Sequence, residues 1–372
     1  MESNLRAALI SLGSKSSKMT AESMGKYFGT VDMLNIKEID VTFGSADEKA
    51  QVVHKGKPIG EYDCVFVKGS FNYSSIARAI TTFFEGKSYM PFQKDAFTVV
   101  HDKLLTHMQF EKARIPSPLT YLSSTSIAAK EILKQIPYPI ILKFPQGTHG
   151  KGVMVADSYA AASSILDALD TLNQPCLIQE YIETAGADIR AMVIGDKVVA
   201  AMKRIAKGDE KRSNLHAGGT SEPCTLDAKY KKIAVDTARA LGLDIAGVDI
   251  LEGPKGPLVI EANVSPGLQG ITNATGIDIA DLIAKFLYEK TIAYNESKQA
   301  AKPTADELLR ELSDVSEQSS DEPAVTQQII SNLDFRGDRI LLPQVLTKMS
   351  GFTEEEELVL EVGRKSIMIR KS

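Results

Sequence analysis

The stretch VDILEGPKGPLVIEANVSPG, residues 248–267, decides how the rest of the sequence is interpreted. Two apolar runs flank the turn-forming residues EGPKGP, which predicts a β-hairpin. The first run carries Asp249, and the second carries Glu261 and Asn263. Because residues i and i+2 of a strand point to the same face, Glu261 and Asn263 share a face, and the hairpin can bring Asp249 beside them.

These three oxygen donors suit Mg²⁺ that is bound together with substrate phosphates. We expect Asp249, Glu261 and Asn263 to be metal ligands, because the surrounding strands are apolar and an unpaired carboxylate there is costly. The alternative is an ordinary surface hairpin with solvated charges. The spacing by itself leaves both interpretations open.

A glycine-bearing loop between two expected strands, KFPQGTHGKGVMVA (residues 143–156), is a second candidate site. Its glycines allow backbone N–H groups to approach a phosphate closely. Lys143 stands at the end of the preceding strand, where its ammonium can point at that phosphate. The run lacks the GxxxxGK[ST] pattern and no helix follows directly, so it is not a Walker-type loop. A plain hairpin turn is the alternative.

Two more stretches carry polar groups in informative places. Gln179-Glu180-Tyr181-Ile182 ends a strand, where backbone groups can read an adenine edge and a carboxylate can bind a ribose hydroxyl; a simple buried strand is the alternative. Residues 202–219, MKRIAKGDEKRSNLHAGG, concentrate cations that can bind an acidic substrate or a developing oxyanion, unless they form a solvated basic loop. These cations are Lys203, Arg204, Lys207, Lys211 and Arg212.

Length and composition limit the class of protein. The 372 residues suit two or three domains, and the net charge of −5 does not favour nucleic-acid binding. Cys64, Cys176 and Cys224 lack a CxxC spacing, so we expect free thiols rather than zinc or disulfides. No apolar run approaches the ~20 residues of a membrane span, and the N-terminus lacks a signal-peptide layout. We therefore expect a cytoplasmic protein without membrane contact.

Periodicity predicts alternating strands and helices, and hence a parallel α/β region over residues 1–95. A loop rich in serine and lysine is expected after the first strand, and a hairpin turning at Gly195-Asp196. A polar, acidic linker is expected over 295–327 and a small, mostly β segment over 328–372. Strands are expected at 5–12, 62–67, 138–144, 153–156, 175–181, 245–251 and 258–262, and helices at 102–113, 126–135, 158–172, 230–241 and 277–294.

Together these motifs resemble the ATP-grasp superfamily, and closely its RimK-type α-L-glutamate ligases. The resemblance covers roughly residues 1–290, and the motifs come in the family's order. The matching residues are Asp102-Lys103, Lys143 with its glycine loop, Gln179-Glu180-Tyr181, Asp188-Ile189-Arg190, Arg212-Ser213-Asn214-Leu215-His216-x-Gly-Gly, and Asp249…Glu261-x-Asn263-x-Ser265-Pro266-Gly267.

The resemblance implies an ATP-grasp fold with a preceding α/β domain over 1–95. A small lobe with the phosphate loop would follow over 96–180, and a large lobe with the metal site over 181–294. It implies ATP contacts from Lys103, Lys143, Gly150, Gly152, Glu180, Tyr181, Asp188, Arg212, Ser213 and Asn214. It implies catalytic roles for Arg212, Asn214 and Arg204, and two Mg²⁺ or Mn²⁺ ions on Asp249, Glu261 and Asn263.

The implied reaction is ATP-dependent addition of an amino acid, with L-glutamate favoured, to an acceptor carboxylate through an acyl phosphate. The acceptor could be a protein tail, an amino-carrier protein or a coenzyme tail. A dipeptide or glutathione-like ligase and a non-catalytic ATP-binding regulator are alternatives. The intact set of lysines, Arg212 and metal ligands argues against the regulator.

The segment RGDRILLPQVLTKMSGFTEEEELVLEVGRKSIMIRK is similar to AbrB-type swapped-hairpin domains. Such domains dimerise, and many bind DNA. Acidic and basic residues balance in this segment, so we expect a homo-oligomer rather than a DNA-binding protein.

Overall fold

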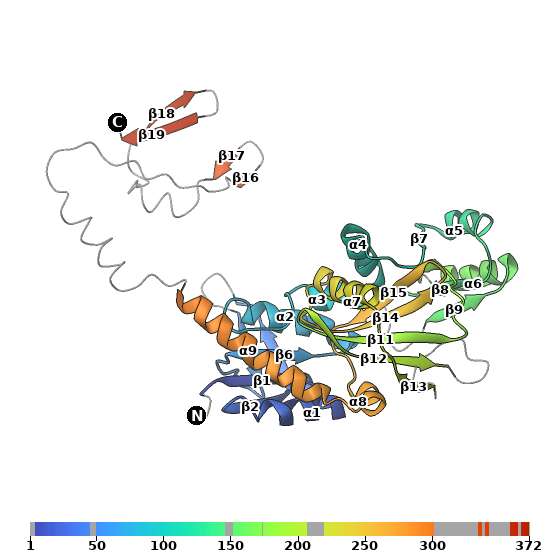
Figure 1. The fold of residues 1–372 in the computed structure, drawn as a ribbon. Coiled ribbons are helices and arrows are strands. Elements are labelled where there is room, and N and C mark those ends of the chain that lie inside the picture. Colours follow the sequence, from blue (N-terminus) through green and yellow to red (C-terminus); the bar gives the residue numbers. More distant parts are fainter. Residues whose placement is uncertain are drawn as a thin grey trace. The chain divides into compact units, whose positions relative to one another are not determined.

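A computed structural model describes residues 4–44, 50–145, 152–172, 174–206 and 219–300, and four strands beyond residue 333. The chain divides into two compact units, Met1–Lys302 and Pro303–Ser372, which are described separately. Helices and both parallel and antiparallel sheets are present (Figure 1), which confirms the expected α/β class.

The first unit begins with a parallel sheet in the strand order β2-β1-β6. β6 is buried along its whole length, which explains its unbroken apolar run. The parallel arrangement expected at the start of the chain is therefore confirmed. The strands are β1 (Arg6–Ser11), β2 (Thr30–Asn35) and β6 (Cys64–Lys68), beside a small antiparallel sheet of β3 (Ile39–Thr42), β4 (Gln51–His54) and β5 (Lys57–Pro58).

The expectation of a loop after β1 is wrong, because helix α1 (Lys15–Met24) occupies most of that segment. The Ser14 side chain caps the helix by accepting from the Ser17 N–H. Thr20 is buried and satisfies its hydroxyl on the Ser16 carbonyl at 2.8 Å. Small polar residues let α1 pack closely against α9 (Ile279–Ala300), so a tertiary contact overrides a composition that resembles a loop.

A four-stranded antiparallel sheet in the order β7-β10-β8-β9 forms the next layer. It has its own small core, in which Leu133 and Leu142 are completely buried. Its strands are β7 (Thr120–Leu122), β8 (Ile140–Lys143), β9 (Val153–Ala156) and β10 (Leu177–Glu180), and its helices are α5 (Ser126–Leu133) and α6 (Tyr159–Thr171).

The largest sheet is antiparallel and has the order β13-β12-β11-β14-β15. Helix α7 (Ala228–Ala240) packs across four of its strands, as Figure 1 shows for β14 and β15. The predicted turn at Gly195 is confirmed: its φ is +62°, and a Cβ would lie 2.7 Å from the Phe286 ring. The strands are β11 (Ala187–Ile194), β12 (Lys197–Ile205), β13 (Thr220–Pro223), β14 (Ile245–Gly253) and β15 (Gly256–Asn263).

The remaining helices of this unit join the sheets. Asp102 caps α4 by accepting from the N–H groups of Leu104 and Leu105 at 2.9 and 3.1 Å. Helix α9 continues to Ala300, past Tyr294, where the linker was expected to begin. The helices not yet given are α2 (Ser74–Phe84), α3 (Ala96–His101), α4 (Lys103–Ala113) and α8 (Gln269–Thr275), with short 3-10 turns η1 (Ile36–Glu38) and η2 (Phe71–Tyr73).

The second unit contains two described hairpins, consistent with the mostly β segment expected there. Their strands are β16 (Asp334–Arg336), β17 (Arg339–Leu341), β18 (Leu358–Gly363) and β19 (Ser366–Lys371). The cysteines are free, as expected; Cys64 is buried, and Cys176 and Cys224 are half-buried. Within the described part of the chain, no helix is both long and apolar enough to cross a bilayer.

Candidate active site

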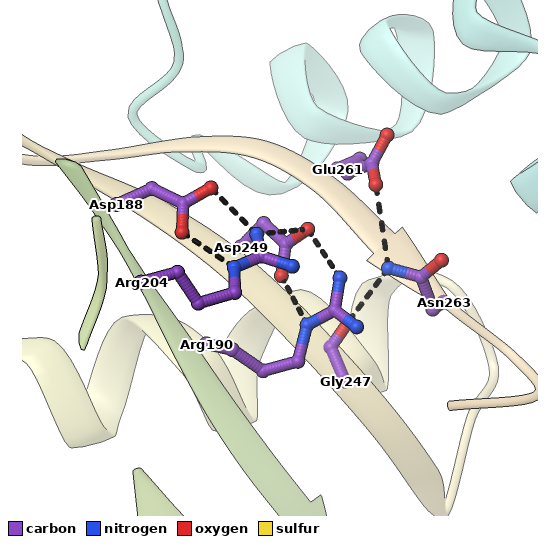
Figure 2. Close-up of polar contacts among 7 residues, drawn as sticks. All are labelled: Asp188, Arg190, Arg204, Gly247, Asp249, Glu261 and Asn263. Carbon is purple, nitrogen blue, oxygen red and sulfur yellow. Dashed lines mark hydrogen bonds and ion pairs between the residues drawn. The ribbon is translucent and has the colours of Figure 1, made fainter. Parts of the chain in front are cut away.

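The predicted metal corner lies on one face of the large sheet. Asp249 of β14 is paired in register with Glu261 of β15, and Gly247 is paired with Asn263. The Asn263 amide donates to the Gly247 carbonyl and to Glu261 Oε1, both at 3.4 Å (Figure 2). Two carboxylates and one side-chain amide therefore lie close together at the predicted positions.

A β-bulge accompanies this arrangement. Asp249 is opposite Glu261, but the next residue, Ile250, is opposite Val259, so Ile260 is an extra residue in β15. Bulges change the direction in which neighbouring side chains point. Here the bulge lets Val259 and Ile250 enter the core while Glu261 remains exposed to solvent.

Two arginines surround Asp249, which is 2% exposed. Arg190 of β11 donates to both Asp249 oxygens at 2.6 Å, and Arg204 Nη2 of β12 lies 2.9 Å from Oδ2. Arg204 also donates to both oxygens of Asp188, at 2.6 and 2.5 Å. Figure 2 shows the resulting network, in which two cations alternate with two anions.

The network controls the protonation of its members. Burial alone would raise the pKa of Asp249, but the charges of Arg190 and Arg204 outweigh it and bring the pKa to about 2. Burial would lower the pKa of Arg204, but Asp249 and Asp188 raise it above its usual value. Glu261 behaves differently: neighbouring protein removes part of its hydration and, with the Asp249 charge, raises its pKa.

Two lysines of the smaller lobe face the same region. Lys143, at the end of β8, donates to Gln179 Oε1 at 2.6 Å, and burial lowers its pKa to about 8. Burial also lowers the pKa of Lys103, the first residue of α4. The Glu261 carboxylate opposes the shift of both lysines, which places their ammonium groups within its electrostatic reach.

The comparisons with known proteins agree with this geometry. Residues 100–287 match the family model described as the RimK-like ATP-grasp domain. This chain belongs to the RimK-like ATP-grasp family. It is therefore an ATP-grasp ligase, as the sequence motifs indicate.

Curated relatives cover most of this ligase. A probable α-L-glutamate ligase of Vibrio cholerae serotype O1 (strain O395) is 38% identical over 258 residues, which cover 68% of this chain and 85% of the relative. The ribosomal protein bS6–L-glutamate ligase of Salmonella schwarzengrund is 37% identical over 241 residues, 64% of this chain and 80% of the relative.

Solved structures agree on the fold. The ATP-grasp ligase PsnB, in complex with a precursor variant, Mg and ADP, superimposes with a TM-score of 0.61 at 17% identity and covers 77% of this chain and 100% of its own. A RimK domain ATP-grasp protein of Sphaerobacter thermophilus superimposes with a TM-score of 0.60 at 19% identity. The match covers 76% of this chain and 98% of that protein. The expected ATP-grasp fold is thus confirmed.

The remaining predicted ATP contacts of the ligase lie in two places. Gly152 has φ +77°, and a Cβ there would lie 2.1 Å from the Phe144 ring, so only glycine fits the end of this loop. Glu180 Oε1 accepts from the Leu119 N–H at 2.8 Å, which ties β10 to the start of β7. Tyr181 directly follows β10. The nucleotide roles of these residues remain predictions.

Four predicted site residues, Gly150, Arg212, Ser213 and Asn214, lie outside the described residues, and their roles remain predictions. Asp188 and Arg204 are described, and each already has a charged protein partner. A ribose contact by Asp188, or a substrate contact by Arg204, therefore requires an exchange of partners.

The sequence interpretation assigned no role to Arg190 or His107. Arg190 is two residues from Asp188 on one strand, so i and i+2 spacing places both on the metal-corner face. His107 lies 3.4 Å from the Gln179 side chain, and burial, with the charges of Lys143 and Lys103, lowers its pKa to about 4. His107 is therefore neutral at physiological pH and supports Gln179, which orients Lys143.

The donor set fits a cation that shares its coordination with a substrate. Among the described residues, no three His, Cys, Asp or Glu side chains form a closed metal cluster. Asp249, Glu261 and Asn263 supply only hard oxygen ligands, and Glu261 is open to solvent. Both Asp249 oxygens already accept from Arg190, so a metal contact by Asp249 also requires an exchange of partners. Mg²⁺ typically takes one or two carboxylates and completes its shell with phosphate and water oxygens.

Proposed function

We propose that this ligase joins the amino group of an amino acid, with L-glutamate favoured, to an acceptor carboxylate through an acyl phosphate. The observation that carries the proposal is the acidic corner of Asp249, Glu261 and Asn263 within electrostatic reach of Lys103 and Lys143. Such a site can bind a metal–triphosphate complex between hard oxygen ligands and cations.

The proposed reaction has two steps. An oxygen of the acceptor carboxylate attacks the γ-phosphorus of ATP, the bond to the leaving ADP oxygen breaks, and an acyl phosphate forms. The amine then attacks the acyl carbon, and the tetrahedral intermediate expels inorganic phosphate and loses a proton to give an amide. Positioning and charge neutralisation supply the catalysis, so no side-chain nucleophile is required.

The predicted site residues divide into groups with different proposed parts in this reaction. Lys143, held by Gln179, and Lys103 neutralise the ATP phosphates, and Arg212, Ser213 and Asn214 are proposed to act beside them. Asp249, Glu261 and Asn263 would hold two Mg²⁺ or Mn²⁺ ions, which supply charge neutralisation of the phosphates when bound. Three further residues would act as positioning residues, because they orient the Asp249 carboxylate. They are Arg190, Arg204 and Asp188.

The curated relatives support the proposed substrates. Both carry glutamate ligase in their names, and the Salmonella relative is named for a ribosomal protein, which favours a protein carboxylate as the acceptor. A coenzyme tail or an amino-carrier protein would present the same chemical group. The proposal therefore specifies a carboxylate as the acceptor group, and the test below distinguishes which kind of molecule carries it.

The proposal is tested by ADP release. The purified chain is incubated with Mg-ATP, one amino acid at a time and an extract of protein and small-molecule acceptors, and the products are analysed by mass spectrometry. ADP release that depends on L-glutamate, with a mass gain of one glutamyl residue or more on an acceptor, is expected. Release with another amino acid, or a dipeptide product, would replace glutamate addition by the dipeptide-ligase alternative.

The C-terminal unit is proposed to dimerise in the manner of an AbrB-like domain, because its described part consists of two hairpins. Deletion of residues 303–372 should lower the molecular mass in solution from that of an oligomer to that of one chain. An unchanged number of chains per particle would remove this proposal.

A further inference from the structure

Lys68, the last residue of β6, is a buried cation that the proposed reaction does not yet use. Lys68 is 5% exposed, and its Nζ donates to the Pro266 carbonyl at 3.3 Å. An ammonium has three N–H donors, and among the described residues this carbonyl is its one hydrogen-bond acceptor. No carboxylate of the described residues lies within 4.0 Å of Nζ, and the Phe66 ring centroid lies 5.2 Å away.

Burying a lysine without a counter-ion is costly, and lysines are almost never fully buried unless they are paired. Burial lowers the pKa of Lys68 to about 8, so the residue remains largely charged at neutral pH. The position therefore holds a positive charge that no carboxylate among the described residues balances. A bound anion would balance it.

The location of Lys68 is a place where ligands commonly bind. β1 lies between β2 and β6, so the chain leaves β1 for one neighbour and reaches the other later. In open α/β sheets, ligands commonly bind at the carboxyl ends of such strands. Lys68 stands at that edge. Gly13, beyond the end of β1, and Gly267 border open space, since a Cβ on either would meet no described atom within 4 Å.

A short loop connects this edge of the sheet to the metal corner. The loop starts at Asn263, and its Ser265 Oγ accepts from the Gly69 N–H at 3.1 Å. Its Pro266 packs against Gly247, where an added Cβ would lie 3.0 Å from the proline Cβ. Gly247 is also the residue whose carbonyl accepts from Asn263. Lys68 therefore binds the loop that begins at a proposed metal ligand.

We infer that Lys68 binds a substrate carboxylate at the carboxyl edge of the parallel sheet, beside the Ser265–Gly267 loop. The inference rests on the proposed function, which requires an acceptor carboxylate and an amino acid that carries its own carboxylates. Either source would provide the missing counter-ion through charge-assisted hydrogen bonds. Because the loop follows Asn263 directly, a carboxylate held by Lys68 would lie close to the proposed metal and ATP phosphates.

The test compares Lys68→Met with Lys57→Met, which removes an exposed lysine on β5. Binding is measured by calorimetry on the full chain with Mg-ADP present. The probe for the amino acid is L-glutamate, and the probe for the acceptor is N-acetyl-L-glutamyl-L-glutamate, whose amine is blocked. Lys68→Met should lower the affinity for one probe at least tenfold. Its affinity for ADP should equal that of the wild type, and its melting temperature should be no lower. Lys57→Met should behave as wild type.

The probe that is weakened identifies the source of the carboxylate. Lys68→Arg keeps the charge and should bind that probe within a few-fold of wild type, which a purely structural role would not require. If Lys68→Met does not fold, Lys68→Gln replaces it with the same expectation. Equal binding of both probes by wild type and the neutral variant overturns the inference, as does a loss confined to ADP.

The outcome is separable from that of the proposed function. If the wild-type chain releases no ADP with any amino acid, the proposed function fails, whereas the Lys68 site is judged by probe binding alone. If the wild type turns over glutamate and Lys68→Met binds both probes as tightly, only the Lys68 inference fails. If the wild type binds neither probe, the inference is overturned directly.

Discussion

Buried charges are balanced at one place in this ligase and unbalanced at another. On the large sheet, Arg190 and Arg204 alternate with Asp188 and Asp249, and every charge has a partner at 2.9 Å or less. At the edge of the parallel sheet, Lys68 has only a carbonyl partner among the described residues. The difference indicates that the network maintains the geometry of the site, whereas the lysine is set to receive a ligand.

The largest effect is expected at the open side of the balanced network, in Glu261→Gln. Removing a residue that only hydrogen-bonds to a metal ligand typically lowers metal affinity or activity about 10–100-fold. Loss of a ligand itself should therefore lower the rate of ADP release at least about 100-fold. Glu261 is exposed, so the free energy of unfolding should change by less than about 1 kcal/mol.

The matched control for this variant is Glu252→Gln, which removes the exposed partner of Lys203 from the neighbouring strand. Amino-acid-dependent ADP release and urea unfolding are measured on both variants. Wild-type turnover in Glu261→Gln would eliminate the metal-ligand role, and equal losses in both variants would show that the loss of a carboxylate anywhere on this sheet, rather than at this position, lowers turnover.

The next effect is on stability, in Arg204→Met. This change leaves Asp188 without its charged partner inside the protein, and breaking a buried pair costs about 3–5 kcal/mol. Lys203 is the adjacent residue on β12, and its pair with Glu252 is largely exposed. Lys203→Met should therefore cost less than about 1 kcal/mol. Similar unfolding free energies for the two variants would contradict the distinction between buried and exposed pairs.

The smallest effect concerns pH and Lys68. Its pKa is about 8 in the folded chain and near 10.5 when unfolded, so between these values the unfolded chain binds more protons. Stability must rise with pH wherever the unfolded state binds more protons. The wild type should thus gain up to about 3 kcal/mol between pH 8 and 10.5 relative to Lys68→Met.

This pH series is measured by urea unfolding without ligands, with Lys57→Met as the matched control. Lys57→Met should follow the wild-type slope, because its side chain is exposed. Parallel curves for wild type and Lys68→Met would mean that Lys68 is hydrated or paired in solution, and the contrast with the arginine network would then disappear.

Local patterns predicted much of the fold. Strand spacing and the turn residues placed Asp249, Glu261 and Asn263 on one face, and the register of β14 and β15 agrees. The Gly195 turn was equally predictable, because a hairpin needs a residue with positive φ there. Helix α1 was not predictable, since its serines and threonine favour helix only when packed against α9.

Longer-range features could not be read from the sequence. The pairing of Arg190 with Asp249 depends on the register between β11 and β14, which are 59 residues apart at this contact. Lys68-Gly69-Ser70 has the composition of a loop, and nothing in it indicates a buried ammonium. That burial follows from the Pro266 loop, whose contact with Lys68 spans 198 residues.

The sequence by itself determined the ligase family, the order of its motifs and the oxygen donors of the metal corner, because these depend on residue type and on spacings within one hairpin. Only the tertiary structure decided which charges neutralise one another and which cation has no carboxylate partner within the described part of the chain. Charge balance depends on distance and burial, and both are set by segments that meet only when the sheets pack together.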